Sequence, residues 1–580
     1  MNNKPITPSD FLLLRHPVHL TGSDASHGLA YEVAVWENDC FRRTVVLLVN
    51  GQELRFSYPD ADCVMPSLSP DLTKMAFLVQ STDGSRLALY DISSAQMHIA
   101  SEHTDVTALV WLPNSQALGL ICGGADVRLY LYDRDGHACQ LLGELPGPVR
   151  APAFSPDGTK LAYLNAGNDL RPYCFHCESG QSFCLSQDGA QPVKPNPPLF
   201  TADGSRVLFA GLSLKTENAP GQVYCLDVAD GGEIPIQHTG DVPTEPIPLF
   251  ADGESLPNSS RYVCAEGDDR FLIVGVRNGR TGIYRVELTG STAAWTLLYE
   301  DRRCIAGLST AGGRISALMS TQQVPFEVYT LTEHGVPQQI THENDWVKGR
   351  TLYPTECLRC VNGGETGWGI FHSGEGNPAV LLIHGGPTCY FSGGFSLEQQ
   401  LLAGAGYDVI FADPHSSSGH GDEYADIRYA ADGTAEKDVL SLLNETVQGG
   451  HGIDACRLGV MGGSYGGFLS AWLIGNHHVF KAACVLRAWL GGEALHAMLG
   501  LDETDMQRLA AQVDIPVLVQ HGEEDPLCLY PYAQDYYKAL KTAQKRLVSF
   551  PNEKHSVGEL NAVNAASFYT EILNWWLDHL

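Results

Sequence analysis

Four segments of the N-terminal half share one pattern, a tight turn followed by an apolar run, and this repeat constrains the fold more than any other feature. They are LSPDLTKMAFL (68–78), a weaker copy WLPNSQALGLI (111–121), FSPDGTKLAYL (154–164) and FTADGSRVLFA (200–210). Aligned on Pro70, Pro113, Pro156 and Ala202, the turns are 43, 43 and 46 residues apart. That period is typical of propeller blades of four short strands.

Each repeat also carries the signals of a β-hairpin. Asp-Gly or Pro-Asp pairs supply the turn in all but the weaker copy, and a second strand ends in segments such as LALYDISS (87–94) and LYLYDRDG (129–136). A helical solenoid would instead place apolar residues every three or four positions. We predict an all-β propeller over residues 1–345 with about seven blades, the first ~20 residues being free to pack on the following domain.

From Arg350 onward the pattern changes to apolar runs that alternate with helix-length segments. The runs are AVLLIHGG (379–386), YDVIFADP (407–414), RLGVMGGS (457–464), IPVLVQHG (515–522) and KRLVSF (545–550). Such runs are typical of strands buried on both faces in a mostly parallel sheet with crossover helices. Residues 346–580 are therefore predicted to form an α/β domain whose chemistry lies at the carboxyl ends of its strands.

The charge and hydropathy of the chain argue against two classes of partner, nucleic acids and membranes. The 67 acidic and 37 basic residues give a net charge of −30, and no run of Lys or Arg offers the clustered cations that nucleic acid or an anionic membrane requires. The N-terminal stretch MNNKPITPSDFLLLRHPVHL has too short an apolar run for an export signal. We therefore expect a cytoplasmic protein that binds neither nucleic acid nor membranes.

Sixteen cysteines are expected to be mostly reduced thiols in that compartment. Two CxxC pairs occur, Cys174/Cys177 and Cys357/Cys360. They are about 180 positions apart and lack histidines at the spacing of a zinc finger, so buried or surface thiols are the better interpretation.

The strongest chemical motif is Gly462-Gly463-Ser464-Tyr465-Gly466-Gly467, which lies between the strand RLGVM and the helical segment FLSAWLIG. G-x-S-x-G in that context is a nucleophile elbow, a sharp turn that projects the serine hydroxyl into a cleft. The glycines are needed because the turn leaves no room for Cβ atoms. Ser464 is thus the predicted nucleophile.

A serine hydroxyl needs a base and an acid that orients the base, and in this fold they follow in the order Ser, Asp or Glu, His. Asp525 follows the strand IPVLVQ, and His555 follows the strand KRLVSF. His521 is a rival base that more readily makes a local hydrogen bond at its strand end. Glu523 and Glu524 are rival acids.

Acyl transfer also needs donors for the oxyanion. The N–H of Tyr465, next to the nucleophile, is one candidate. The second is Gly386, in the His384-Gly385-Gly386-Pro387 loop that follows an early strand.

Together, the repeats, HGGP, GGSYGG, HGEED and a near-terminal histidine resemble the prolyl oligopeptidase family, in particular its acylaminoacyl-peptidase and dipeptidyl-aminopeptidase-like branch. The resemblance covers nearly the whole chain. It implies a seven-bladed propeller that caps an α/β-hydrolase cleft and admits only short peptides. It also implies catalytic roles for Ser464, Asp525 and His555, with oxyanion contacts from Tyr465 and the HGGP loop, and it implies no metal or organic cofactor.

Two departures limit the resemblance. Where the family has an Arg-Gly-Ser-x-Gly-Tyr-Gly run, this chain has Asp413-Pro414-His415-Ser416-Ser417-Ser418-Gly419-His420-Gly421. Ser464 and Asp525 are 61 positions apart (525 − 464), where relatives generally carry a longer insert. The P1 preference, the endo- or exopeptidase mode, the natural substrate and a homo-oligomeric state therefore stay open. So do two alternatives, a small-molecule esterase or amidase and a catalytically inactive propeller scaffold.

Overall fold

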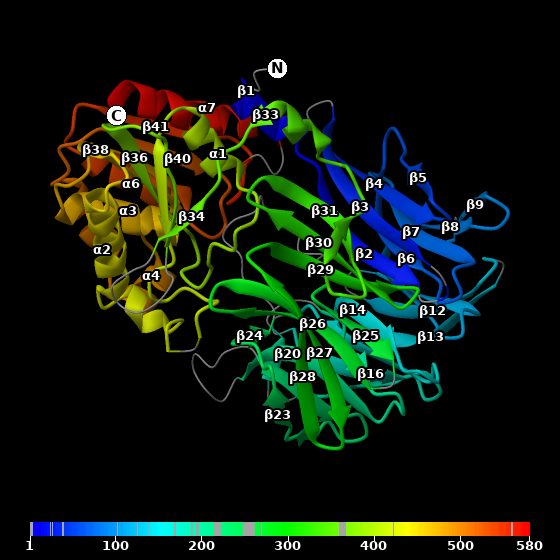
Figure 1. Cartoon of the computed structure of the whole chain (residues 1–580). Helices are drawn as coiled ribbons and strands as arrows, with labels where there is room; N and C mark the ends of the chain where they lie inside the picture. Colours follow the sequence, from blue (N-terminus) through cyan, green and yellow to red (C-terminus); the bar gives the residue numbers. More distant parts are fainter. Residues whose placement is uncertain are drawn as a thin grey trace.

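The structure is a computed structural model. It describes residues 4–580 except 24, 26, 38–39, 101, 124–125, 137, 168–169, 187–189, 193–195, 214–221, 247–260, 268, 359–366, 422 and 558–560. Figure 1 shows two bodies, β-sheets from blue to green on one side and a mixed layer of helices and strands from yellow to red on the other.

In the described residues, seven successive sheets form the blades of a propeller, which confirms the predicted fold and blade number. The first four blades are β2 to β5 (His16–Ser23, Gly28–Glu37, Cys40–Val49, Gln52–Phe56), β6 to β9 (Asp62–Leu68, Lys74–Ser81, Gly84–Asp91, Gln96–Ile99), β10 to β13 (Val106–Trp111, Ala117–Cys122, Val127–Asp133, Cys139–Leu145) and β14 to β17 (Val149–Phe154, Lys160–Asn165, Pro172–His176, Gln181–Cys184).

The last three blades include two with additional short strands. They are β18 to β22 (Ala190–Pro192, Leu199–Phe200, Arg206–Ser213, Gln222–Asp227, Glu233–Ile234), β23 to β28 (Gln237–Gly240, Glu245–Pro246, Val263–Gly267, Arg270–Arg277, Arg280–Thr289, Thr292–Asp301) and β29 to β32 (Cys304–Ala311, Arg314–Thr321, Val324–Leu331, Pro337–Gln339). Apolar residues of neighbouring blades pack together, and these inter-blade layers form the core of the propeller.

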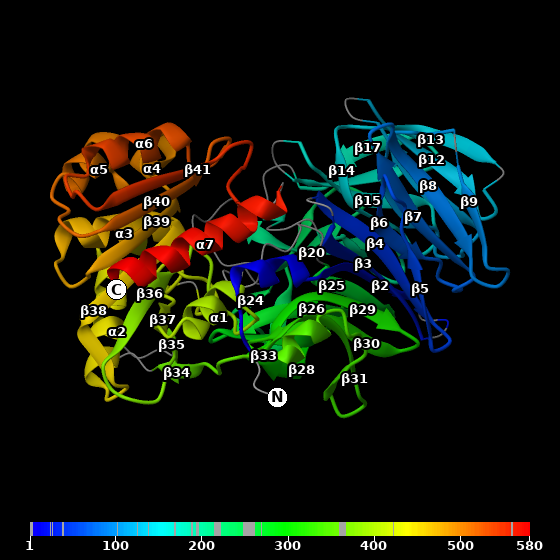
Figure 2. The ribbon, with the colours of Figure 1, turned by 90° about the horizontal axis from the view of Figure 1, so that it is seen from above.

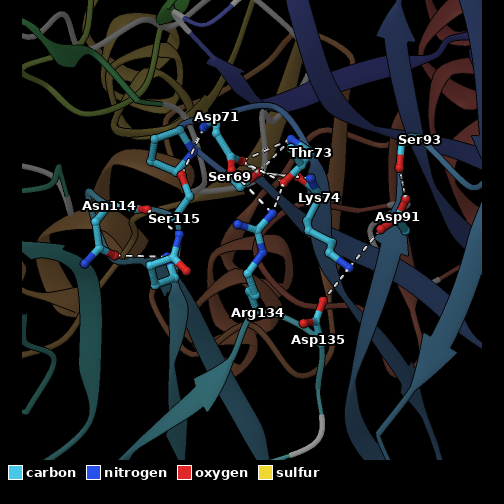
Figure 3. Close-up of polar contacts among 12 residues, drawn as sticks. Ser69, Asp71, Thr73, Lys74, Asp91, Ser93, Asn114, Ser115, Arg134 and Asp135 are labelled. Atoms are coloured by element: carbon cyan, nitrogen blue, oxygen red, sulfur yellow. Dashed lines mark hydrogen bonds and ion pairs between the residues drawn. The ribbon is translucent and has the colours of Figure 1, made fainter.

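The repeated turn has a local physical cause. Ser69 Oγ accepts the N–H of Lys74 at 3.0 Å and donates to Asp71 Oδ1 at 2.7 Å, which closes the turn between β6 and β7 (Figure 3). Ser155 and Thr201 make the equivalent pair of bonds in later repeats. Because each turn is closed by its own side chains, the repeat can be recognised in the sequence.

Lys74 and its neighbours also tie one blade to the next. Lys74 Nζ lies 2.9 Å from Asp91 of its own blade and 3.1 Å from Asp135 of the following blade (Figure 3). The N–H of Asp71 donates to Ser115 Oγ at 3.0 Å, across the same boundary. The turn residues therefore serve both the hairpin and the contact between blades.

The C-terminal part is an α/β-hydrolase with a mixed, mostly parallel sheet, as predicted. Its strands lie in the order β34-β35-β37-β36-β38-β39-β40-β41, and the two edge strands β34 and β35 are antiparallel. The bounds are β34 Glu356–Leu358, β35 Gly367–Ile370, β36 Asn377–Ile383, β37 Asp408–Ala412, β38 Ile453–Ser464, β39 Ala482–Ala488, β40 Val517–Gly522 and β41 Lys545–Phe550. Strand β39 lies between β38 and β40 and was not among the predicted strands.

Helices cover both faces of this sheet. They are α1 (Leu397–Gly404), α2 (Thr434–Gln448), α3 (Tyr465–Asn476), α4 (Glu493–Leu499), α5 (Glu503–Ala510), α6 (Tyr530–Ala539) and α7 (Ala562–His579), with 3-10 turns η1 (Pro8–Leu13), η2 (Asp345–Gly349) and η3 (Ile427–Ala430). One face packs against α2, α3, α5 and α6, and the other packs against α1 and α7. None of the described helices is both long and apolar enough to cross a bilayer.

The N-terminal segment joins the two bodies. β1 (Lys4–Pro5) pairs in parallel with β33 (Arg350–Thr351), and η1 packs on α7, as the blue and red segments of Figure 2 show. Phe11 is buried against Phe395 and Leu401 of the hydrolase part. The first residues of the chain thus lie on the C-terminal part, whereas the boundary between 345 and 346 stays a prediction.

Candidate active site

Ser464 occupies a strained turn between β38 and α3. Its backbone has φ 60° and ψ −121°, an unfavourable conformation for a residue with a Cβ. A Cβ on Gly466 would lie 2.1 Å from the carbonyl oxygen of Ile383, and one on Gly462 would lie 2.6 Å from the same atom. The glycines therefore allow the first turn of α3 to lie directly against β36.

The two predicted oxyanion donors lie beside this turn. Tyr465 is the first residue of α3, so its N–H has no acceptor within the helix. A Cβ built on Gly385 would be 3.4 Å from Ser464 Cβ, which places the HGGP loop next to the serine. Gly386 has φ +117°, and a Cβ there would lie 2.5 Å from Thr388 N, so the loop requires glycine at this position.

Asp525 and His555 come together from the loops after β40 and β41. His555 Nδ1 lies 2.7 Å from Asp525 Oδ2, and the N–H groups of Leu527 and Cys528 donate to the other carboxylate oxygen at 2.8 and 2.9 Å. Asp525 is almost wholly buried. Burial alone would raise the pKa of Asp525, but the hydrogen bonds from His521, His555 and Cys528 hold it below its ordinary value. The carboxylate is thus an ionised orienting group for His555.

Ser464 lies next to a residue that the sequence prediction missed. Among the described residues, the hydrogen-bond contact of its Oγ is with Cys528 Sγ at 4.0 Å, and none joins it to His555. Cys528 Sγ, an Asp525 oxygen and a ring nitrogen of His555 lie within 4.8 Å of one another. The structure thus brings Asp525 and His555 into contact and places Ser464 beside the thiol that adjoins both. Cys528 follows Asp525 by three positions, and that proximity was the signal available in the sequence.

Comparison with known proteins finds similarity to one family. The model of the prolyl oligopeptidase family matches residues 394–490. The chain is 29% identical to the uncharacterized peptidase YuxL of Bacillus subtilis over 359 residues, which is 56% of this chain and 54% of that protein. It is 29% identical to the acylamino-acid-releasing enzyme of Rattus norvegicus over 537 residues, 84% of this chain and 67% of that protein. The chain is thus similar to members of the prolyl oligopeptidase family, and residues 394–490 match the model of that family.

A solved structure agrees with the family fold over the full chain. The acylaminoacyl peptidase of Pyrococcus horikoshii has a TM-score of 0.78 at 18% identity and covers 99% of this chain and 97% of its own. At that identity, the likeness establishes the fold of this chain. The chain spans only about half to two thirds of the length of the curated relatives it matches.

The rival residues have other partners. His521 Nε2 lies 2.6 Å from the carbonyl oxygen of Cys528, the local hydrogen bond expected of a histidine at a strand end. Glu523 accepts from Ser549 Oγ at 2.7 Å, and Glu524 is exposed. Asp525 is therefore the acid of this loop that contacts His555.

The 413–421 run that departs from the family pattern connects the HGGP loop to the propeller. Buried Asp413 lies 2.9 Å from His420 Nε2, and His384 Nε2 lies 2.9 Å from Ser417 Oγ. The N–H of Gly419 donates to Glu245 of β24 in the sixth blade at 2.6 Å. Burial lowers the pKa of His384. These residues link the HGGP loop to the interface between the two bodies through hydrogen bonds.

The shortened region after Ser464 begins with a β-bulge. The register of β38 and β39 shifts between Gly463, which faces Leu486, and Ser464, which faces Ala488. Arg487 is the extra residue, with φ +35°, and its guanidinium lies 2.9 Å from the position that a Cβ on Gly463 would occupy. α4 and α5 follow. Arg487 thus places a cation directly beside the elbow. The sequence predicts only a shortened insert in this segment and does not reveal that position.

The two CxxC pairs lie elsewhere. In the first pair both are free thiols: Cys174 is buried within β16, and half-buried Cys177 directly follows that strand. Cys357 is a half-buried free thiol in β34, and Cys360 lies outside the described residues.

Proposed function

We propose that the protein is a serine peptidase that cleaves short peptides through an acyl-enzyme on Ser464. The observation that carries the proposal is the strained serine at the start of α3, which lies beside the HGGP loop. Its hydroxyl contacts the Cys528 thiol, and that thiol lies next to the hydrogen-bonded pair of Asp525 and His555. The relatives, which include an acylamino-acid-releasing enzyme, support a peptide substrate.

In the proposed mechanism His555 removes the proton of Ser464 as the hydroxyl attacks the substrate carbonyl. Asp525 holds the imidazole through the 2.7 Å bond to Nδ1 and stabilises the cation that forms. A rotation of the serine side chain away from Cys528 brings its hydroxyl to His555, in line with catalytic hydrogen bonds that tighten only when substrate is bound. His555 then protonates the leaving amine, and water cleaves the acyl-enzyme.

The oxyanion of the tetrahedral intermediate is proposed to accept from the N–H of Tyr465 and from Gly386. Removing one such donor costs about 10²–10³ in kcat in serine peptidases. The 413–421 network supports this assignment, because it anchors the HGGP loop on one side and Glu245 of the propeller on the other. We further propose that the propeller restricts access to short peptides.

A fluorophosphonate probe tests the nucleophile directly. We expect the wild-type protein to be labelled and Ser464→Ala not to be. Ser470→Ala is the matched control, because Ser470 lies in the same helix and, within the described part of the chain, its hydroxyl donates to the carbonyl of Gly466 at 2.7 Å. Absence of labelling in the folded wild-type protein would refute the proposal.

Substrate class is tested with three chromogenic substrates. These are an N-acylated peptide anilide, the same peptide with a free N-terminus, and a p-nitrophenyl ester. Turnover of either anilide supports a peptidase. Which of the two is cleaved shows whether the enzyme acts on peptides with an acylated or with a free N-terminus. Turnover confined to the ester favours the esterase alternative.

A further inference from the structure

The proposed mechanism uses no thiol, yet a cysteine contacts the nucleophile. Cys528 is 4% exposed, and its Sγ lies 4.0 Å from Ser464 Oγ. It also lies within 4.8 Å of one oxygen of Asp525 and one ring nitrogen of His555. Sulfur, imidazole nitrogen and carboxylate oxygen thus converge at one point beside the serine.

We propose that Cys528, His555 and Asp525 form a binding site for a thiophilic divalent cation of the Zn²⁺ class, and that the bound cation switches hydrolysis off. The inhibitory effect rests on the proposed function, since it acts through Ser464 and His555. The binding site itself does not.

The set of donors fits such a cation. Zn²⁺ takes cysteine sulfur at about 2.3 Å, histidine nitrogen at about 2.0–2.1 Å and carboxylate oxygen at about 2.0–2.2 Å, in tetrahedral geometry. Ligand atoms of such a tetrahedron are roughly 3.3–3.8 Å apart. His555 Nδ1 and Asp525 Oδ2 are 2.7 Å apart in their hydrogen bond and have to separate to that spacing, whereas Cys528 Sγ lies within 4.8 Å of a donor atom of each residue. Side-chain rotation can supply both movements. Ser464 Oγ or water takes the fourth position.

The charges of the site also balance once a cation is present. Cys528 is 4% exposed and lies beside Asp525, so the binding step starts from its neutral thiol. On binding, the S–H bond breaks, the proton goes to solvent, and the thiolate bonds to the metal with no change in oxidation state. The thiolate and the Asp525 carboxylate then neutralise a dication. The nearby Arg487 favours the thiolate and repels the metal, so its two effects on binding oppose each other.

Inhibition follows from the use of His555 as a ligand. A ring nitrogen bound to the metal either no longer accepts the proton of Ser464 or no longer donates to Asp525. Either change removes the general base. A chelator reverses the effect, because the thiolate takes a proton back from solvent when the metal leaves.

Metal binding is measured first without activity, in the Ser464→Ala variant. Co²⁺ is the probe, because its thiolate complexes give a charge-transfer absorption band. We expect a saturable band that disappears when Cys528→Ser or Cys528→Ala is added. The two replacements guard against one variant failing to fold. A band that persists in both double variants would overturn the site.

A matched control lies on the propeller. Among the described residues, a second group of possible ligands, His103, Asp105 and Cys122, also closes to within 4.8 Å, and Cys122 is buried. The control variant Cys122→Ser should leave the Cys528-dependent band unchanged. If Cys122→Ser abolishes the band, the cation lies on the propeller and the proposal is wrong.

Activity is measured next with buffered free Zn²⁺, each variant being compared with its own metal-free rate. We expect Cys528→Ser to raise the half-inhibitory concentration about tenfold or more, and Cys122→Ser to leave it unchanged. Equal inhibition of wild type and Cys528→Ser would overturn the switch. A wild-type protein without turnover would instead refute the proposed function, while the cobalt titration still decides the site.

Discussion

Replacing Gly466 by alanine should separate catalysis from folding more sharply than any change of a reactive group. The added Cβ would lie 2.1 Å from the carbonyl oxygen of Ile383 and 2.7 Å from that of His384. Both contacts are with backbone, so α3 must retreat from β36 by about 1 Å to relieve them. That movement carries Ser464 and the N–H of Tyr465 away from the HGGP loop.

A misplacement of about 1 Å at a reacting centre costs about 10²-fold. We therefore expect kcat/KM to fall about 100-fold in Gly466→Ala, which corresponds to about 2.7 kcal/mol of lost transition-state stabilisation. Overpacking should lower the free energy of unfolding by about 1–3 kcal/mol, which leaves the protein folded.

The assay compares the rate of fluorophosphonate labelling and of anilide hydrolysis with thermal unfolding on the same samples. Gly349→Ala is the control, because Gly349 is exposed, ends η2 and has no atom within 4 Å of an added Cβ. It should retain wild-type rates. Gly466→Ala reacting at the wild-type rate would refute the argument that the elbow requires this close approach.

Three further changes test other parts of the structure. Asp525→Asn should lower kcat by about 10³–10⁴-fold by removing the orienting carboxylate, and a loss under about tenfold would argue against Asp525 as the acid. His372 donates to buried Asp408 at 3.0 Å, which raises the pKa of His372. Folding therefore favours the protonated form of His372. The bond to Asp408 adds its full share to the free energy of unfolding below about pH 6.5, and this share is lost as the pH rises through the raised pKa. His372→Gln should therefore lower the urea midpoint more at about pH 5.5 than at about pH 9, and the opposite order would contradict the sign. Asp10→Asn weakens the buried pair with Arg350 and should cost about 1.5–3 kcal/mol in urea unfolding, whereas an unchanged midpoint would show that the N-terminal segment contributes little.

The features that could be predicted from the sequence are those whose contacts lie within a short stretch of the chain. The turn of Ser69, Asp71 and Lys74 is closed by side chains within six residues, so its recurrence revealed the propeller. The elbow around Ser464 likewise depends on adjacent glycines. Chain order and strand ends were enough to pair Asp525 with His555, which lie 2.7 Å apart.

Strand β39 shows why other features were missed. The segment AACVLRA is buried on both sides apart from Arg487. Its apolar run is so short that periodicity alone does not distinguish a strand from part of a connecting segment. Its place between β38 and β40, and the bulge that sets Arg487 beside the elbow, arise from strand pairing across the sheet. No local pattern encodes that pairing.

The sequence by itself determined the repeat and the mostly parallel sheet and supplied the candidate reactive groups, because turn chemistry, hydrophobic period and motif order are local properties of a chain. Tertiary structure alone decided which groups meet. It set Cys528 against Ser464, tied Gly419 to Glu245 in another domain, and placed Phe11 under α7. Such contacts depend on how elements distant in the chain pack together, and close packing fixes them only when the whole fold has formed.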